Sequence, residues 1–209
     1  MKFVSLLSSG IDSPVATYLV SKTSKEIILL HGDIRPFTDE REIENFQTLA
    51  DHIKKISSCS IKVYIAAHGK NLEVYKKNCN NKYTCIFCKR MLLRYAEKIA
   101  EKEEADAIVM GDSLGQVASQ TLQNINVIDS AVKIPIIRPL IGFDKEDIVR
   151  IAKELGTYDL SILPSDPCMA VPNKPATQAK LDKILEEEKK IDVNKLVNEV
   201  IKKLKIQSI

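Results

Sequence analysis

The stretch that decides the fold is Lys2-Phe3-Val4-Ser5-Leu6-Leu7-Ser8-Ser9-Gly10-Ile11-Asp12-Ser13, at the start of the chain. Its apolar first half predicts a buried strand over residues 2–7, and residues 13–21 predict the helix that follows. A helix that begins directly after a strand presents unpaired backbone N–H groups and the positive end of its dipole. The stretch therefore predicts an anion site that suits a phosphate group.

The side chains of residues 8–13, here called the phosphate loop, suit the same ligand. Ser8, Ser9 and Ser13 add hydroxyl donors, and Gly10 lets the backbone approach closely. Asp12 places a carboxylate beside the anion, which makes physical sense mainly where Mg²⁺ lies between them. The simpler alternative is that serine and aspartate only cap an ordinary helix, because both favour N-caps. The loop has neither the Walker sequence nor the dinucleotide fingerprint.

Apolar runs alternate with amphipathic stretches along the rest of the chain. This alternation predicts an α/β fold, a doubly wound sheet of five parallel strands covered by helices. We expect the strands at residues 2–7, 26–31, 60–66, 107–110 and 134–137. We expect the helices at residues 13–21, 39–56, 84–102 and 144–155, and two Lys/Glu-rich helices with solvated charged faces at residues 177–190 and 193–204.

Composition and charge are those of a globular protein: of 209 residues, 44% are apolar and 28% charged. The longest apolar runs are far shorter than the roughly 20 residues of a membrane span. The strand pattern at residue 2 leaves no room for a signal peptide. We therefore expect a cytoplasmic protein without a membrane partner. The net charge of +3 is too small to indicate a nucleic-acid partner by itself.

The five cysteines are expected to be reduced thiols, so their spacing indicates metal or catalytic chemistry rather than disulfides. Cys85 and Cys88 form a pair three residues apart at the start of an expected helix. Cys168 lies in the proline-rich loop that follows residue 162. Cys59 and Cys79 stand alone in the sequence.

Two motifs resemble those of a known family. The phosphate loop resembles the SGGxDS loop of the PP-loop ATP pyrophosphatases, with Ser9 in place of the middle glycine, which requires a negative φ at Ser9. The block Gly111-Asp-Ser-Leu-Gly-Gln-Val-Ala-Ser-Gln-Thr-Leu is similar to the catalytic domain of the tRNA 4-thiouridine synthetases, also called tRNA sulfurtransferases. Arg138-Pro-Leu-Ile-Gly, Asp144-Lys, Gly156-Thr-Tyr and Ser161-Ile-Leu-Pro extend the likeness, which runs from about residue 2 to about residue 177.

The resemblance implies an adenine nucleotide alpha-hydrolase-like PP-loop fold, with a catalytic domain over residues 1–176 and a C-terminal helical extension over residues 177–209. It implies ATP and Mg²⁺ as cofactors, with AMP and pyrophosphate as products. His31 would hold adenine through its backbone. A role of its ring as a catalytic base is the weaker alternative. The ATP contacts that the resemblance implies are Leu6, Leu7, Ser8, Ser9, Gly10, Asp12, Ser13, His31, Gly32, Lys89, Gly111 and Gln120.

The resemblance also implies sulfur transfer, with catalytic roles for Asp12, Cys85, Cys88 and Cys168. Adenylation of a uridine oxygen makes AMP the leaving group, and a sulfur nucleophile displaces it. The three cysteines resemble those of archaeal members in which they hold a 4Fe-4S cluster and leave one iron open for sulfide. A zinc site with a fourth ligand such as Cys79 or a histidine is one alternative. A persulfide or disulfide relay without metal is another.

The partners implied are tRNA and a sulfur donor such as sulfide, and a homodimer is one expected assembly. Because the catalytic pattern starts at residue 2, either tRNA binds through basic surface and a separate RNA-binding subunit, or the acceptor is not tRNA. The basic residues beside the cysteine pair form either a phosphate-binding face or an ordinary solvated helix face: Lys76, Lys77, Lys82, Lys89, Arg90 and Arg94. One alternative keeps the chemistry with a small-molecule acceptor, such as a thiamine precursor. The other is a non-catalytic subunit that binds ATP or a cluster.

Overall fold

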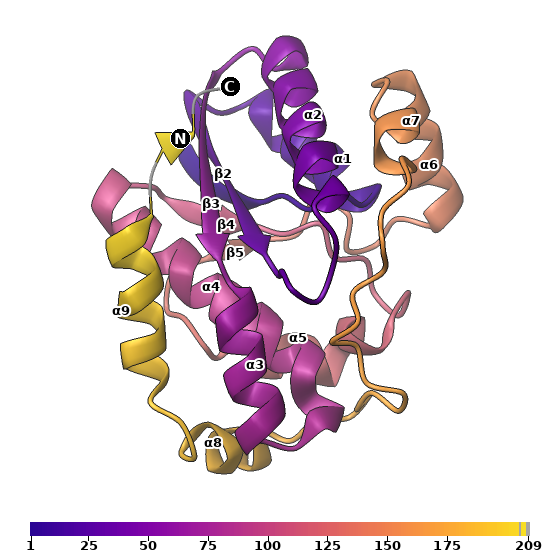
Figure 1. Ribbon diagram of the computed structural model, residues 1–209. Coiled ribbons are helices and arrows are strands. Elements are labelled where there is room, and N and C mark those ends of the chain that lie inside the picture. The colour runs from indigo at the N-terminus through magenta and orange to yellow at the C-terminus, as the bar shows by residue number, and fades with distance from the viewer. Residues whose placement is uncertain (205, 208–209) are drawn as a thin grey trace.

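The computed structural model describes residues 1–204 and 206–207. At its centre is a six-stranded sheet in the order β5-β4-β1-β2-β3-β6 (Figure 1). The five parallel strands are β1 (Lys2–Leu6), β2 (Glu26–Asp33), β3 (Ser60–Ala67), β4 (Ala107–Val109) and β5 (Ile136–Ile137). The predicted parallel α/β sheet is confirmed. The sixth strand, β6 (Ile206–Gln207), pairs antiparallel with β3 and was not predicted, because two residues carry no detectable pattern.

Helices cover both faces of this sheet. Successive strand residues point to opposite sides, and because both sets are apolar, each face must be buried. In β1, Val4 packs with one cluster of buried residues and Phe3 with the other. The described helices are α1 (Asp12–Ser21), α2 (Arg41–Ile56), α3 (Gly69–Asn78), α4 (Thr84–Glu103), α5 (Leu122–Asp129), α6 (Lys145–Glu154), α7 (Tyr158–Ser161), α8 (Leu181–Glu188) and α9 (Val193–Lys203). The helices α3, α5 and α7 were not among the predicted elements. Among the described residues, no helix has the length and apolar content needed to cross a membrane.

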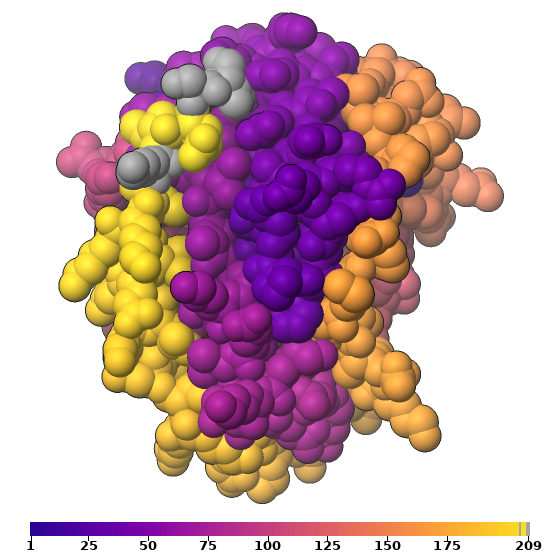
Figure 2. Space-filling model, viewed as in Figure 1, coloured from indigo at the N-terminus to yellow at the C-terminus, as the bar shows by residue number. Residues whose placement is uncertain are grey.

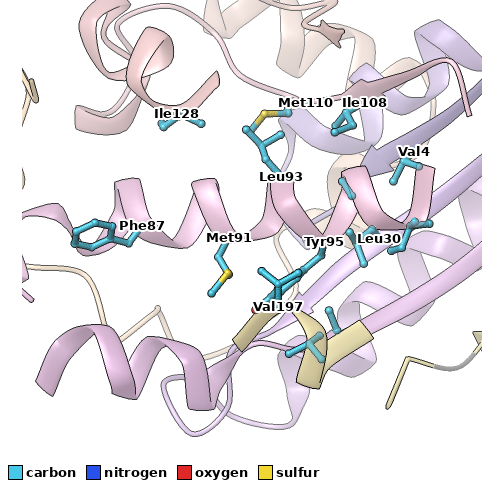
Figure 3. Packing of buried hydrophobic residues seen from close by; sticks show 14 of the residues in the cluster. Val4, Leu30, Phe87, Met91, Leu93, Tyr95, Ile108, Met110, Ile128 and Val197 are labelled. Carbon is cyan, nitrogen blue, oxygen red and sulfur yellow. The ribbon is translucent and has the colours of Figure 1, made fainter. Parts of the chain in front are cut away.

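The long helix α4 fills the centre of one face. Its apolar side packs against residues from the sheet, from α5 and from α9 (Figure 3). Met91 and Tyr95 are fully buried on this side. Because α4 touches so many elements, its position determines where the side chains of its first two turns lie.

The two C-terminal helices pack onto this core (yellow in Figure 1). Ile184 of α8 and Val197 and Val200 of α9 are buried in the same cluster as the apolar side of α4. The helix α8 begins at Leu181, four residues after the expected start at residue 177. The division of the chain into units at residue 177 stays a prediction.

Candidate active site

A cavity of about 340 Å³ opens at the carboxyl edge of the sheet, above the ends of β1, β2 and β4. The strand order reverses at β1, and open α/β sheets bind their ligands at such a switch point. The volume is in the range of small-molecule sites. Except for Ser9, all the expected nucleotide-contacting residues line it: Leu6, Leu7, Ser8, Gly10, Asp12, Ser13, His31, Gly32, Lys89, Gly111 and Gln120.

The phosphate loop is held by bonds between its own serines. Ser13 Oγ accepts from the backbone N–H of Ser8 at 2.9 Å and lies 3.0 Å from Ser8 Oγ. The N-cap position of α1 is Ile11, which makes no side-chain cap, so the first N–H groups of α1 are not capped by serine or aspartate there. The helix-cap alternative is therefore not supported. Among the described non-glycine residues only Glu104 has a positive φ, so Ser9 meets the condition that its replacement of glycine imposes.

The loop after β4 touches the phosphate loop directly. A Cβ atom at Gly111 would lie 2.7 Å from Ser13 Cα and 2.8 Å from Ser13 N. These distances are too short for any side chain, and the obstructing atoms are backbone. A glycine at position 111 is thus what allows the two loops to form one cavity wall.

The carboxylates Asp12 and Asp112 line the cavity, and each is paired with basic side chains. Asp112 accepts from Lys89 Nζ at 2.7 Å, from Arg138 Nε at 3.0 Å and from Gln120 Nε2 at 3.3 Å. Burial alone would raise the pKa of Asp112, but Lys89 and Arg138 outweigh it and lower that pKa below its ordinary value. Asp12 pairs with Lys145 at the start of α6.

Several residues of the cavity and its ion pairs had no predicted role. Asp112, Arg138 and Lys145 lie inside the quoted motif blocks, so the signal was present but was not used. Glu42 of α2 also lines the cavity, and no motif marks it. Its place beside the site follows only from the packing of α2.

His31 is held in the cavity wall with both ring nitrogens engaged. Nδ1 lies 3.0 Å from the carbonyl oxygen of Leu7, and Nε2 lies 3.0 Å from Glu42 Oε2. The ring stacks on Phe46 at 4.2 Å. Because neither nitrogen is free, a structural role fits His31 better than that of a base. By contrast, Gln120 Oε1 is buried without a hydrogen-bond partner, so a ligand N–H or O–H group would satisfy it.

The three cysteines expected to act on sulfur come together beside this cavity. Cys85 and Cys88 lie in the first turns of α4, directly before Lys89. Burial, together with the nearby thiols of Cys85 and Cys168, raises the pKa of Cys88 to about 12. Burial and Cys168 also raise the pKa of Cys85. The thiol of Cys168 therefore lies near those of Cys85 and Cys88.

Backbone contacts bring Cys168 to this place. Residues 162–175 run along the segment that follows β2, as Figure 2 shows for the orange and violet parts of the chain. The Met169 N–H donates to the carbonyl oxygen of Phe37 at 2.8 Å, and Thr38 Oγ1 donates to that of Asp166 at 2.9 Å. The proline-rich segment is thus fixed on both sides of Cys168.

The donor geometry does not suit a single metal ion. In residues 1–204 and 206–207, no three His, Cys, Asp or Glu side chains are arranged to hold one. Cys79, the candidate fourth ligand for zinc, instead donates to the carbonyl oxygen of Glu187 at 3.5 Å. Cys59 precedes β3 and packs against the opposite core cluster. All five cysteines are free thiols, as expected.

Half of the expected basic surface is neutralised within the protein. Arg90 and Arg94 both form ion pairs with Glu188 at 2.9 and 2.8 Å, and Arg90 is only 1% exposed. Lys89 pairs with Asp112. A phosphate-binding surface that includes these three side chains was predicted, and this part of the prediction is wrong because their charges are already paired. Lys77 and Lys82 are exposed.

Relatives of known name resemble this chain over most of its length. The chain is 43% identical over 203 residues to a "Probable tRNA sulfurtransferase" of Methanothermobacter thermautotrophicus, a match that covers 97% of this chain and 52% of the relative. It is 45% identical over 186 residues to the protein of the same name in Methanobrevibacter smithii, covering 88% of this chain and 49% of the relative. The chain thus spans about half the length of the curated relatives it matches.

Two solved structures resemble the chain, one closely and one in fold alone. The crystal structure of a 4-thiouridine synthetase–RNA complex with bound ATP matches with a TM-score of 0.94 at 38% identity, covering 99% of this chain and 54% of the other. The NMN synthetase of Francisella tularensis shares the fold, with a TM-score of 0.59 at 14% identity over 96% of this chain and 84% of the other. A family model described as "Thiamine biosynthesis protein (ThiI)" matches residues 1–193, and the chain therefore belongs to the ThiI family.

Proposed function

We propose that this chain binds ATP with Mg²⁺ and adenylates a uridine of tRNA, whose oxygen is then replaced by sulfur to give 4-thiouridine. The observation that carries the proposal is the cavity in which the phosphate loop meets Gly111. The names of the relatives and the ATP bound to the 4-thiouridine synthetase of similar structure support it. ATP-dependent tRNA sulfurtransferase is therefore the activity we assign.

The nucleotide would lie across the strand ends. The phosphate loop and the start of α1 would receive the triphosphate, because the N–H groups of the first turn have no side-chain cap. Leu6 and Leu7 would lie beneath the nucleoside, and Gln120 Oε1 would gain the donor it lacks. Lys89 would exchange its bond to Asp112 for a phosphate oxygen.

Magnesium fits the donors that face the cavity. Asp12 and Asp112 offer carboxylate oxygens, and Mg²⁺ usually binds one or two carboxylates together with substrate phosphates. Asp12 would hold the ion beside the triphosphate. When bound, the ion would neutralise phosphate charge.

The reaction balances without an external oxidant. The uridine O4 atom attacks the α-phosphorus of ATP, and pyrophosphate leaves with the electron pair of the broken P–O bond. Hydrosulfide then attacks C4 of the adenylated base, and AMP leaves with the electrons of the C–O bond. Residues of the cavity orient the α-phosphate, and the thiols beside it handle the sulfur.

We propose that Cys85, Cys88 and Cys168 are the sulfur-handling thiols. They are the right donors for a 4Fe-4S cluster, whose cysteine ligands bind different irons and need not surround one ion. Such a cluster would supply an open iron for sulfide. Among the described residues, no three donor side chains surround one position, which argues against a zinc ion. Visible absorbance after anaerobic purification would distinguish the cluster from a metal-free relay.

A small-molecule acceptor is a second candidate, because the matching family model is described as a thiamine biosynthesis protein. The test is anaerobic incubation with ATP, Mg²⁺, sulfide and unmodified tRNA, followed by nucleoside analysis. We expect 4-thiouridine, AMP and pyrophosphate. Bound ATP without any thionucleoside would instead favour the small-molecule acceptor. A homodimer is a further proposal, which gel filtration would test.

Replacing Gly111 with alanine is expected to weaken ATP binding at least ten-fold. The added Cβ would meet the backbone of Ser13, so the two loops must separate and the phosphate loop must change shape. Titration calorimetry with ATP and Mg²⁺ measures the effect. Gly142→Ala is the matched control, because a Cβ there meets nothing within 4 Å. Equal affinity of the two variants would contradict the proposed role of the contact.

A further inference from the structure

Glu42 is an unexpected residue to find in the wall of a site for phosphate. It lies in the first turn of α2, and its side chain is only 12% exposed. The positive end of the α2 dipole stabilises a carboxylate at this place. Since a carboxylate repels phosphate, the contacts of Glu42 must account for its position.

The two oxygens of Glu42 join two parts of the cavity. Oε1 accepts from Ser9 Oγ in the phosphate loop at 3.2 Å, and Oε2 lies 3.0 Å from His31 Nε2 at the end of β2. His31 is fixed by its bond to Leu7 and by its stacking on Phe46, one turn after Glu42 in α2. Glu42 is therefore anchored itself and offers Ser9 an immobile partner.

We propose that Glu42 is a positioning residue that holds the phosphate loop in its ligand-binding shape through the hydroxyl of Ser9. The inference rests on the proposed binding of ATP. It also explains how the loop uses a serine at the position where the SGGxDS motif has glycine: the added hydroxyl connects the loop to α2. Neither Ser9 nor Glu42 needs to touch the nucleotide for this effect.

The other bonds that tie the loop to the rest of the protein are more exposed. Gly10 accepts from Ser161 Oγ at 3.4 Å in an exposed position, and Asp12 pairs with Lys145, whose side chain is 49% exposed. The bond between Ser9 and Glu42 is partly buried. A partly buried bond to a charged acceptor restricts motion more than an exposed one, which competes with water.

A double-mutant cycle tests this. Affinities for ATP with Mg²⁺ and for AMP are measured by calorimetry on the wild type, Ser9→Ala, Glu42→Ala and the double variant. We expect Ser9→Ala to weaken ATP binding roughly five-fold, the equivalent of one ordinary hydrogen bond, and to have a smaller effect on AMP. In the Glu42→Ala background, Ser9→Ala should have no further effect, because its partner is already gone.

Glu44→Ala is the matched control, since Glu44 is an exposed carboxylate in the same turn of α2, and it should bind ATP like the wild type. Urea unfolding of each variant shows whether a loss of affinity follows from a loss of fold. An equal loss from Ser9→Ala in both backgrounds, or no loss in either, would overturn this inference alone. A wild-type chain that does not bind ATP would overturn the proposed function as well.

Discussion

Replacing Cys168 with alanine is expected to abolish transfer of sulfur to tRNA while ATP binding is retained. Cys168 is the thiol that the proline-rich segment brings to the pair on α4, and it influences the pKa of both partners. It does not line the cavity, so the nucleotide contacts stay intact. The measurement is nucleoside analysis after anaerobic incubation with ATP, Mg²⁺, sulfide and tRNA, with ATP affinity determined in parallel.

Cys59→Ala serves as its control, because Cys59 is a half-buried thiol at the other end of the sheet. We expect that variant to form 4-thiouridine at the wild-type rate. Undiminished transfer by Cys168→Ala would rule out every arrangement in which three thiols act together, with or without a cluster. Loss of both sulfur transfer and ATP binding would show that Cys168 supports the fold instead.

Glu188→Gln should lower the free energy of unfolding by about 3–5 kcal/mol, as breaking a buried ion pair usually does. The Glu188 carboxylate, 8% exposed, receives hydrogen bonds from both Arg90 and Arg94 at 2.8 to 2.9 Å. Its loss leaves two guanidinium groups in the protein interior without a counter-charge. Urea unfolding followed by circular dichroism measures the change.

The neighbouring Glu187 provides the matched comparison. It pairs with Lys190, whose side chain is half exposed, and accepts from the N–H of Asn80. Glu187→Gln should cost less than about 1 kcal/mol. Burial would raise the pKa of Glu188, but the two arginines lower it below its usual range. The stabilisation is therefore present at neutral pH and lost as the pH falls through that lowered pKa. Equal effects of the two substitutions would contradict a special role for Glu188.

The parallel sheet and the residues around the cavity were predictable because they depend on local signals. A loop of serine and glycine that directly follows a buried parallel strand must lie at the carboxyl edge of the sheet. The Gly111 block, which follows β4, lies at the same edge for the same reason. Neighbouring parallel strands then bring these loops together without further information. The direct contact of Gly111 with Ser13 follows from that arrangement.

Contacts between distant segments were not predictable in the same way. Arg90 and Glu188 are 98 residues apart, and a Lys/Glu-rich helix gives no sign that one of its carboxylates will be buried. The hydrogen bond from Ser9 to Glu42 depends on where α2 packs, and the residues around Ser9 and Glu42 in the sequence carry no signal of that packing. The charged residues of α4 were assigned to the surface because charge predicts exposure on average, and the exception arises from tertiary pairing.

The order of Cys85, Cys88 and Lys89 along α4 has an evolutionary consequence. A helix turns by roughly 100° per residue, so one residue inserted between the thiols and the lysine would rotate the two groups away from each other. The segment that carries Cys168 is irregular and absorbs changes of length more easily. In descendants of this chain, the spacing within α4 should therefore stay constant while the length of the proline-rich segment drifts.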